Sequence, residues 1–404
     1  MAEALATLSL QEDASKKQKA TLYIVSPSGK PVWCSDGGVD PGRLATTSAV
    51  VSACVAIASI NEIDAGDRKI VIDRRGELIF VASGVRESAA ALRRCTAAAH
   101  DAVLSSLTDK IHAALKQRPN ADVAALLGSA KLVLAGLARS WDRSLSILGP
   151  LGLATESVST VPLERRVRKA IQRELKDAVA SLKPVPVVCA ALLWKNRLAG
   201  LAKPRTVSLE TRDVATLVNF LSSQRSALSS GAAAWTPVCL PVLGSQGFLH
   251  AYVAGLGDDA VLALVGAAPD AFERFHASRA RLEAALLEAG AFQALRDATN
   301  DLPPDVCGGC EHAAVVFERD GTKLCLCAPG GDAAASREYD RLVDRCRGER
   351  GALACAAAGG RTYACAPRGR YLVFATLRGR VPTAEVVDAL AALQERAERS
   401  DLIM

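Results

Sequence analysis

The residues of this sequence best suited to metal chemistry are cysteines gathered in its last quarter. Cys307-Gly-Gly-Cys310, the nearby His312, and then Cys325 and Cys327 could supply four nitrogen or sulfur ligands to zinc, whose structural sites are tetrahedral. The ligand spacing is irregular, however, and Cys325 and Cys327 alternate along an apolar stretch in which cysteine acts as a small buried side chain. A redox role for the Cys-Gly-Gly-Cys motif is disfavoured, because a strand follows it where a helix should begin. We therefore expect no metal and no cofactor.

Residues for covalent catalysis are not recognisable in the sequence. It contains neither the G-x-S-x-G motif of many hydrolases nor the G-x-x-x-x-G-K-[ST] loop that cradles nucleotide phosphates. His250 stands in an apolar stretch without an assignable acidic partner, so we interpret it as a packed strand residue rather than a general base. We expect a protein that acts by binding, and not an enzyme.

Length and charge set the broad class of the protein. The chain has 404 residues, and 50% of them are hydrophobic, which predicts two or three domains rather than one core. Its 49 basic and 43 acidic residues are spread along the chain, so nucleic-acid binding is not expected. Residues 1–19 lack the pattern of a secretory signal, and the apolar run from Leu44 to Ile60 is shorter than the roughly 20 residues of a membrane span. We expect a cytoplasmic protein whose residues 1–19 form a short disordered tail.

The order of predicted elements repeats three times along the chain. Two apolar strands, a helix, three strands and a second helix are indicated over residues 20–107, again over 185–288, and again over 313–399. Such a ββαβββα unit can form a five-stranded antiparallel sheet that buries one face under two helices and leaves its other face and its edge strands available to partners. The fold class is therefore α+β, with three tandem units of one kind.

One stretch, Ala233 to Leu256, has an unusual composition. Two apolar strands are predicted to meet at Gly244-Ser245-Gln246-Gly247, whose glycines could adopt the positive φ of a tight turn. Pro237 and Pro241 fall within the first strand and confine it to a sheet edge or a bulge. We expect a hairpin whose first strand lies at a sheet edge or contains a bulge.

The order of residues in this hairpin closely resembles the signature of the SAND (Mon) family. The matching residues, to which we assign a structural role, are Trp235, Thr236, Pro237, Cys239, Leu240, Pro241, Gly247, Phe248, Leu249, His250, Ala251 and Tyr252. The resemblance continues in family order from residues 25–31 through 65–71 to 401–404. The chain departs from the family at Val242-Leu243-Gly244, where Lys-Phe-Asn is usual, and it is weakest in the third repeat.

The resemblance implies a fold, partners and a function. The ββαβββα unit is the longin arrangement, and family members carry three in tandem. They join a Ccz-type longin protein to form a guanine nucleotide exchange factor for a late-endosomal Rab GTPase, recruited through partners to the endosomal or vacuolar membrane surface. The alternative is a non-catalytic longin scaffold or adaptor in vesicle trafficking. Exchange requires no covalent chemistry, in agreement with the motifs that the sequence lacks.

The repeats and the resemblance together divide the chain. We expect a first longin domain with extra helices at 20–148, a linker with an amphipathic helix at 149–184, a second longin domain at 185–296, a linker at 297–311 and a third longin domain at 312–404. The amphipathic helix, residues 162–182, is basic and either docks on its own domain or lies on anionic lipid. We favour docking.

The partner-binding surface is placed in the first domain, as the resemblance implies. The helix from Pro41 to Ser59 carries no charge between Arg43 and Glu62, although a solvated helix normally displays charges on its outer face. Its small polar residues Thr46, Thr47, Ser48 and Ser52 are therefore the predicted contacts, with burial inside the same domain as the alternative.

Overall fold

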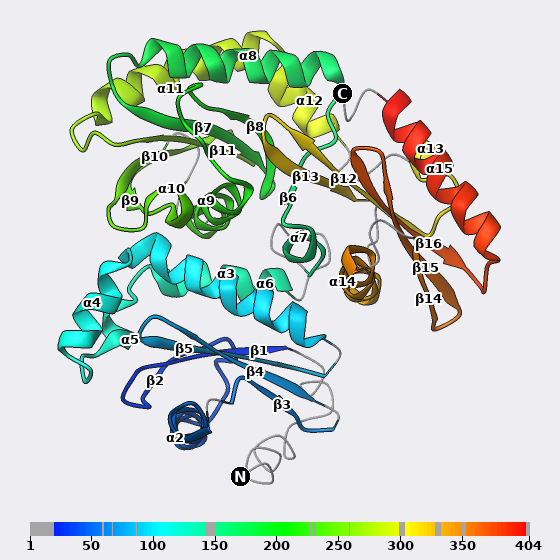
Figure 1. Cartoon of the computed structure of the whole chain (residues 1–404). Coiled ribbons are helices and arrows are strands. Elements are labelled where there is room, and N and C mark those ends of the chain that lie inside the picture. The colour runs from blue at the N-terminus through cyan, green and yellow to red at the C-terminus, as the bar shows by residue number, and fades with distance from the viewer. Residues whose placement is uncertain are drawn as a thin grey trace.

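The computed structural model describes residues 20–58, 60–66, 68–85, 87–141, 150–225, 228, 232–257, 259–298, 304–327, 333–348 and 353–400. The expected tail, residues 1–19, lies outside them. Three antiparallel sheets, each with the predicted element order, make up three domains that meet around one central helix (Figure 1). The predicted α+β class and tandem arrangement are confirmed.

The first sheet has the strand order β2-β1-β5-β4-β3. Its elements are β1 (Thr21–Val25), β2 (Pro31–Cys34), α2 (Pro41–Ala58), β3 (Glu62–Asp64), β4 (Lys69–Arg75), β5 (Leu78–Gly84) and α3 (Ala89–Leu107). Helices α2 and α3 cover opposite faces of the sheet, so the central strand β5 is buried on both sides. The extra helices α4 (Lys110–Gln117), α5 (Val123–Leu126) and α6 (Ala130–Trp141) follow, and α5 packs beside β2. Among the described strands, β3 is left as the open edge of this sheet.

The second sheet repeats this order as β8-β7-β11-β10-β9. Its elements are β7 (Val187–Trp194), β8 (Arg197–Ala202), α9 (Thr211–Gln224), β9 (Ala233–Val238), α10 (Pro241–Gly244), β10 (Leu249–Leu256), β11 (Ala260–Gly266), α11 (Phe272–Glu288) and α12 (Ala291–Asp297). In the predicted hairpin, β9 pairs with β10. Ala233 lies opposite Ala254 at one end of the pairing and Val238 lies opposite Leu249 at the other. Strand β9 lies at the sheet edge, as expected.

The connection in this hairpin differs from the prediction. Pro241 is not in the strand but opens α10, where a proline without an N–H is well placed. Neither Gly244 nor Gly247 has a positive φ, so the chain reverses through one turn of helix instead of a tight glycine turn. The four-residue helix replaces the left-handed residues that a tight turn would need.

The third sheet keeps the same order and gains a sixth strand. Its elements are α13 (Pro304–Cys307), β12 (His312–Arg319), β13 (Thr322–Cys327), α14 (Ala333–Gly348), β14 (Ala354–Ala358), β15 (Arg361–Arg368), β16 (Tyr371–Arg378) and α15 (Thr383–Arg399). The sheet order is β14-β15-β16-β12-β13-β6, in which β6 (Val158–Ser159) pairs parallel to β13. That strand comes from the segment between the first two domains.

The segment expected to be a linker at 149–184 is thus part of two domains. Helix α7 (Pro150–Thr155) packs on α14, and its Leu151 and Ala154 belong to the core of the third domain. After β6, the Thr160 N–H donates to Cys325 O at 3.0 Å and the Val161 N–H to Leu198 O at 3.1 Å. This strap therefore joins the edge strand of the third sheet to the edge strand β8 of the second.

The amphipathic helix α8 (Arg165–Ser181) docks on the second sheet. Ile171 and Leu175 are buried and lie so close to Gly200 of β8 that a side chain there would overlap both of them. The basic residues of α8 lie on its other sides. We therefore find α8 packed beside α11 as a helix of the second domain (Figure 1).

Helix α3 lies at the centre of the molecule. One side covers the first sheet, and another packs on α6, α7 and α9, so that one apolar core extends through all three domains. None of the described helices is long and apolar enough to cross a membrane.

Candidate interaction surfaces

The signature residues form an aromatic cluster on β9, β10 and α11. Trp235 is half-buried and stacks on His250, with ring centroids 5.5 Å apart and an angle of 10° between the ring planes. Phe272 and Phe275 meet the indole edge-on. Tyr252 is fully buried, and its hydroxyl lies 2.9 Å from His276 Nδ1. His250 thus packs against Trp235, and among the residues that the structure describes it forms no ion pair with an acid.

The connection between the two halves of the signature is held by a buried carboxylate. Asp213 of α9 accepts hydrogen bonds from the N–H groups of Val242 (2.9 Å) and Leu243 (2.8 Å), the first residues of α10 after Pro241. Burial raises the pKa of Asp213, and the two N–H donors oppose this rise because they stabilise the ionised form. Asp213 therefore fixes α10 on α9.

The same segment anchors the second domain on the first. The Cys239 N–H donates to Ser105 O of α3 at 2.9 Å, and the Asp109 N–H donates to Ser245 O at 2.8 Å. Gln246 Nε2 donates to Asp109 Oδ2 at 2.8 Å. Cys239 of the signature, together with Ser245 and Gln246 of the connection that follows it, thus links the second domain to the first.

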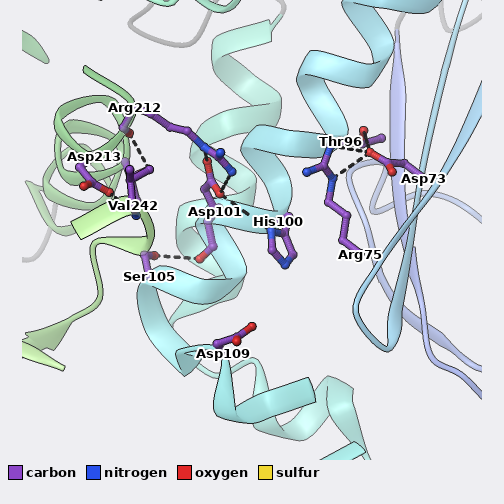
Figure 2. Close-up of polar contacts among 12 residues, drawn as sticks. Asp73, Arg75, Thr96, His100, Asp101, Ser105, Asp109, Arg212, Asp213 and Val242 are labelled. Carbon is purple, nitrogen blue, oxygen red and sulfur yellow. Dashed lines mark hydrogen bonds and ion pairs between the residues drawn. The ribbon is translucent and has the colours of Figure 1, made fainter. Parts of the chain in front are cut away.

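An ion pair completes this joint (Figure 2). Arg212 of α9 donates from Nε and Nη2 to the two carboxylate oxygens of Asp101 on α3, at 2.5 and 2.6 Å. Burial raises the pKa of Asp101, and Arg212 partly reverses this rise. Neither residue was singled out from the sequence, although an acid in the middle of an alanine-rich helix was an available signal.

A histidine pair stands beside this joint. His100 of α3 and His112 of α4 have their Nε2 atoms 3.2 Å apart, and the Glu77 N–H donates to His112 Nδ1 at 3.1 Å. Burial and the neighbouring His112 lower the pKa of His100 to about 4, so both rings are neutral at pH 7. Sequence analysis missed this pair because the two residues lie on different helices.

The outer face of α2 is the surface predicted to bind a partner. Thr46 is exposed, and Thr47 is half-buried with its hydroxyl donating to Arg43 O at 2.9 Å. Ser52 is half-buried beside Gly29. Ser48, by contrast, is 1% exposed and faces the sheet, so its prediction as a contact is wrong. It follows Leu44 by four residues and precedes Val51 by three, which places it on the inner stripe.

The face that α2 presents to solvent is apolar. Beyond its first two residues, the exposed positions described on α2 are Ala45, Thr46, Ala49, Ala56 and Ile57, and Ile57 is 81% exposed. Strand β3 follows five residues later and forms the open edge of the first sheet. We call these five residues together with β3 the α2–β3 surface.

The cysteines and His312 of the third domain are distributed through its packing. Cys325 and Cys327 are buried on β13 with their sulfur atoms 3.5 Å apart, as the strand interpretation implied. His312 Nδ1 lies 3.0 Å from the Tyr339 hydroxyl. Among the described residues, no group of three or more potential ligands is placed to hold a metal ion.

Comparison with known proteins agrees with this architecture. The model of the first longin domain of FUZ, MON1 and HPS1 matches residues 20–135, and that of the second longin domain of the same proteins matches residues 186–282. A solved structure of the gliding protein MglB from Thermus thermophilus covers 35% of this chain and 98% of its own, at 15% identity. Its TM-score of 0.25 is too low to support a conclusion.

Curated relatives match about 70% of the chain. A vacuolar fusion protein MON1 homolog of Arabidopsis thaliana is 29% identical over 290 residues, 69% of this chain and 45% of the relative. The MON1 homolog B proteins of Mus musculus and Homo sapiens are each 32% identical over 296 residues, 70% of this chain and 51% and 52% of the relatives. The chain spans about half the length of these relatives. Both longin-domain models match this chain, and the relatives above are MON1 homologs. The chain therefore belongs to the family of FUZ, MON1 and HPS1.

Proposed function

We propose that this chain is one subunit of a heteromeric guanine nucleotide exchange factor, which pairs with a Ccz-type longin protein and acts on a late-endosomal Rab GTPase. The relatives are named vacuolar fusion proteins, which supports a role in vesicle trafficking. The pairing, the GTPase and recruitment to an endosomal or vacuolar membrane through partners belong to the proposal.

The α2–β3 surface is the observation that carries the proposal. A solvated helix normally shows charges to water, but the outer face of α2 shows small residues and Ile57. Small side chains let a second helix approach closely, and an exposed large apolar side chain gains free energy when a partner covers it. Strand β3, which follows α2 in the chain and lies at an edge of the first sheet, presents N–H and C=O groups to which a partner strand can bond.

The proposed mechanism needs binding alone. An exchange factor binds the GTPase more tightly when the nucleotide site is empty, and by linkage it lowers the affinity of the GTPase for nucleotide by the same factor. No general base or metal from this chain enters that scheme. The platform for the GTPase would be completed by the partner across the α2–β3 surface, so the chain alone should be a poor exchange factor.

A nucleotide-release assay tests the proposal. Release of a fluorescent GDP analogue from a late-endosomal Rab would be measured with this chain alone, with a Ccz-type protein alone and with both, and a Rab of another compartment serves as control. We expect acceleration only when both proteins are present and only for the late-endosomal Rab. Binding of the Rab without acceleration would instead indicate a scaffold or adaptor.

A further inference from the structure

A cavity lies between the second and third domains, where α8 and β8 face the hairpin of β12 and β13. Its volume is about 320 Å³, and pockets for small ligands start at about 300 Å³. Basic residues line it from three parts of the chain: Arg168 and Lys169 of α8, Arg319 of β12, and Arg370 of the turn between β15 and β16. We call this cavity the inter-domain recess.

Two of these arginines lie against aromatic rings. The guanidinium of Arg319 lies 5.1 Å from the ring centroid of Phe317. The guanidinium of Arg370 lies 5.2 Å from the ring centroid of Tyr371, and Arg370 Nε donates to the Tyr371 hydroxyl at 2.8 Å. A guanidinium that is already held by a ring loses less rotamer freedom when it binds an anion. Both groups are therefore preorganised for binding.

A buried hydroxyl also lines the inter-domain recess. Thr322 stands opposite Arg319 in the register of β12 and β13, so the two side chains lie on the same face of the sheet. Thr322 is 3% exposed, and its Oγ1 has no hydrogen-bond partner among the residues that the structure describes. A buried hydroxyl without a partner costs free energy, which a ligand that accepts its hydrogen bond would recover.

The electrostatics of the recess favour an anion. Its two acids, Glu318 and Asp320, are exposed, so water screens them, whereas Arg168 and Arg319 are half-buried. Burial lowers the pKa of Arg319 to about 10, and the positive charge of Arg168 adds to this shift, so the two groups lie close enough to repel each other. Arg168 Nη1 donates to Leu163 O at 3.1 Å, and a guanidinium has five N–H donors, so it can keep an internal contact and still bind an anion.

We propose that the inter-domain recess binds a small soluble anion that carries phosphate groups and bridges the second and third domains. Phosphate oxygens accept two parallel N–H bonds from a guanidinium, and the Thr322 hydroxyl can donate to a further oxygen. Arg168 belongs to the second domain and Arg319 to the third, so a ligand held by both connects the two domains. Because Thr322 is buried and both arginines are half-buried, the ligand has to enter the recess, which favours a small molecule over a flat membrane surface.

Calorimetric titration of the full chain tests the site, with inorganic pyrophosphate and inositol hexakisphosphate as probes at about 150 mM salt. We expect saturable binding of at least one probe, with one site per chain, and a Tm that rises with the concentration of that probe. Arg168→Gln and Arg319→Gln should each weaken binding by at least about tenfold. Arg173→Gln is the matched control, because Arg173 lies on the same helix, is 68% exposed and does not line the recess. It should bind as wild type does.

Thr322→Val separates a built site from general attraction by charge. It keeps the shape and the charge of the recess and removes the hydroxyl without a partner, so the Tm without ligand should be unchanged or higher. Its affinity for the probe should fall by about tenfold, the loss expected for a hydrogen bond to a charged group.

Four results would overturn the proposal. They are no saturable binding of either probe, wild-type affinity in Thr322→Val, equal losses in Arg173→Gln and Arg319→Gln, and sedimentation of the chain with vesicles that contain phosphoinositides when neither soluble probe binds. The last result would assign these basic residues to a membrane surface.

Discussion

Arg212 of α9 and Asp101 of α3 form a bidentate ion pair across the boundary between the first and second domains. The carboxylate is buried, and the arginine is half-exposed. Across the same boundary, the Cys239 N–H donates to Ser105 O of α3, and the Asp109 N–H, just after α3, donates to Ser245 O. These polar groups act together with the apolar packing of α3 and α6 on α9 to hold the first domain against the second.

Removing the arginine should destabilise this joint. In Arg212→Met, Asp101 keeps its burial and loses its cation, so we expect a loss of about 2 kcal/mol in the free energy of unfolding. Chemical denaturation would measure it. The double variant Asp101→Asn with Arg212→Met should lose less than the single variant, and Arg205→Met, at an exposed position, should change nothing. Equal losses in single and double variants would contradict this reading.

Truncation of the signature tryptophan should act on stability. Trp235 is half-buried and contacts three aromatic rings, so Trp235→Ala should cost about 2 kcal/mol, below the 3 to 5 kcal/mol of a fully buried aromatic residue. Thermal unfolding checks the loss, and nucleotide release with the partner at low temperature should be unchanged. Lost release at full stability would make Trp235 a partner contact.

The histidine pair should make stability fall in acid. A base whose pKa is lowered in the folded state, here to about 4 for His100, is protonated first in the unfolded chain. The contribution of neutral His100 to the free energy of unfolding is complete above pH 6.5 and is lost as the pH falls toward 4. At pH 5 the loss is about 2 kcal/mol. Denaturant titrations at pH 7.5 and 5.0 measure it. In His100→Asn this part of the pH dependence should disappear, and an unaltered slope would contradict the assignment.

Much of the fold could be predicted from the sequence because strands and helices in each repeat show clear periods. The strand order and the edge position of β9 follow from the hairpins and from Pro237. The strap from β6 to Val161 could not be predicted, since two residues carry no period and their pairing depends on two distant sheets. The segment 149–184 was expected to be a linker for that reason, whereas its elements pack in the third and second domains.

The candidate surface was predicted in part. The charge-free outer face of α2 was recognised, but Ser48 was placed on it because the helix is apolar on most sides and its period is weak. The joint between the domains was missed, because a buried Asp101 has meaning only beside Arg212, which lies 111 residues away in the chain.

The proposed pairing with a Ccz-type protein depends on the α2–β3 surface, and one substitution there tests it most directly. Ile57→Arg places a charge at a residue that is 81% exposed, so folding should be unaffected. Binding of a partner over this position would bury the guanidinium without a counter-charge, which costs free energy. The matched control is Leu287→Arg, at a 66% exposed leucine on α11. Affinity for the Ccz-type protein would be measured by titration, followed by GDP release from the Rab. We expect Ile57→Arg to weaken pairing by at least about tenfold, or 1.4 kcal/mol, and to reduce release in step, with Leu287→Arg unchanged. Wild-type affinity and release in a stably folded Ile57→Arg variant would contradict the account.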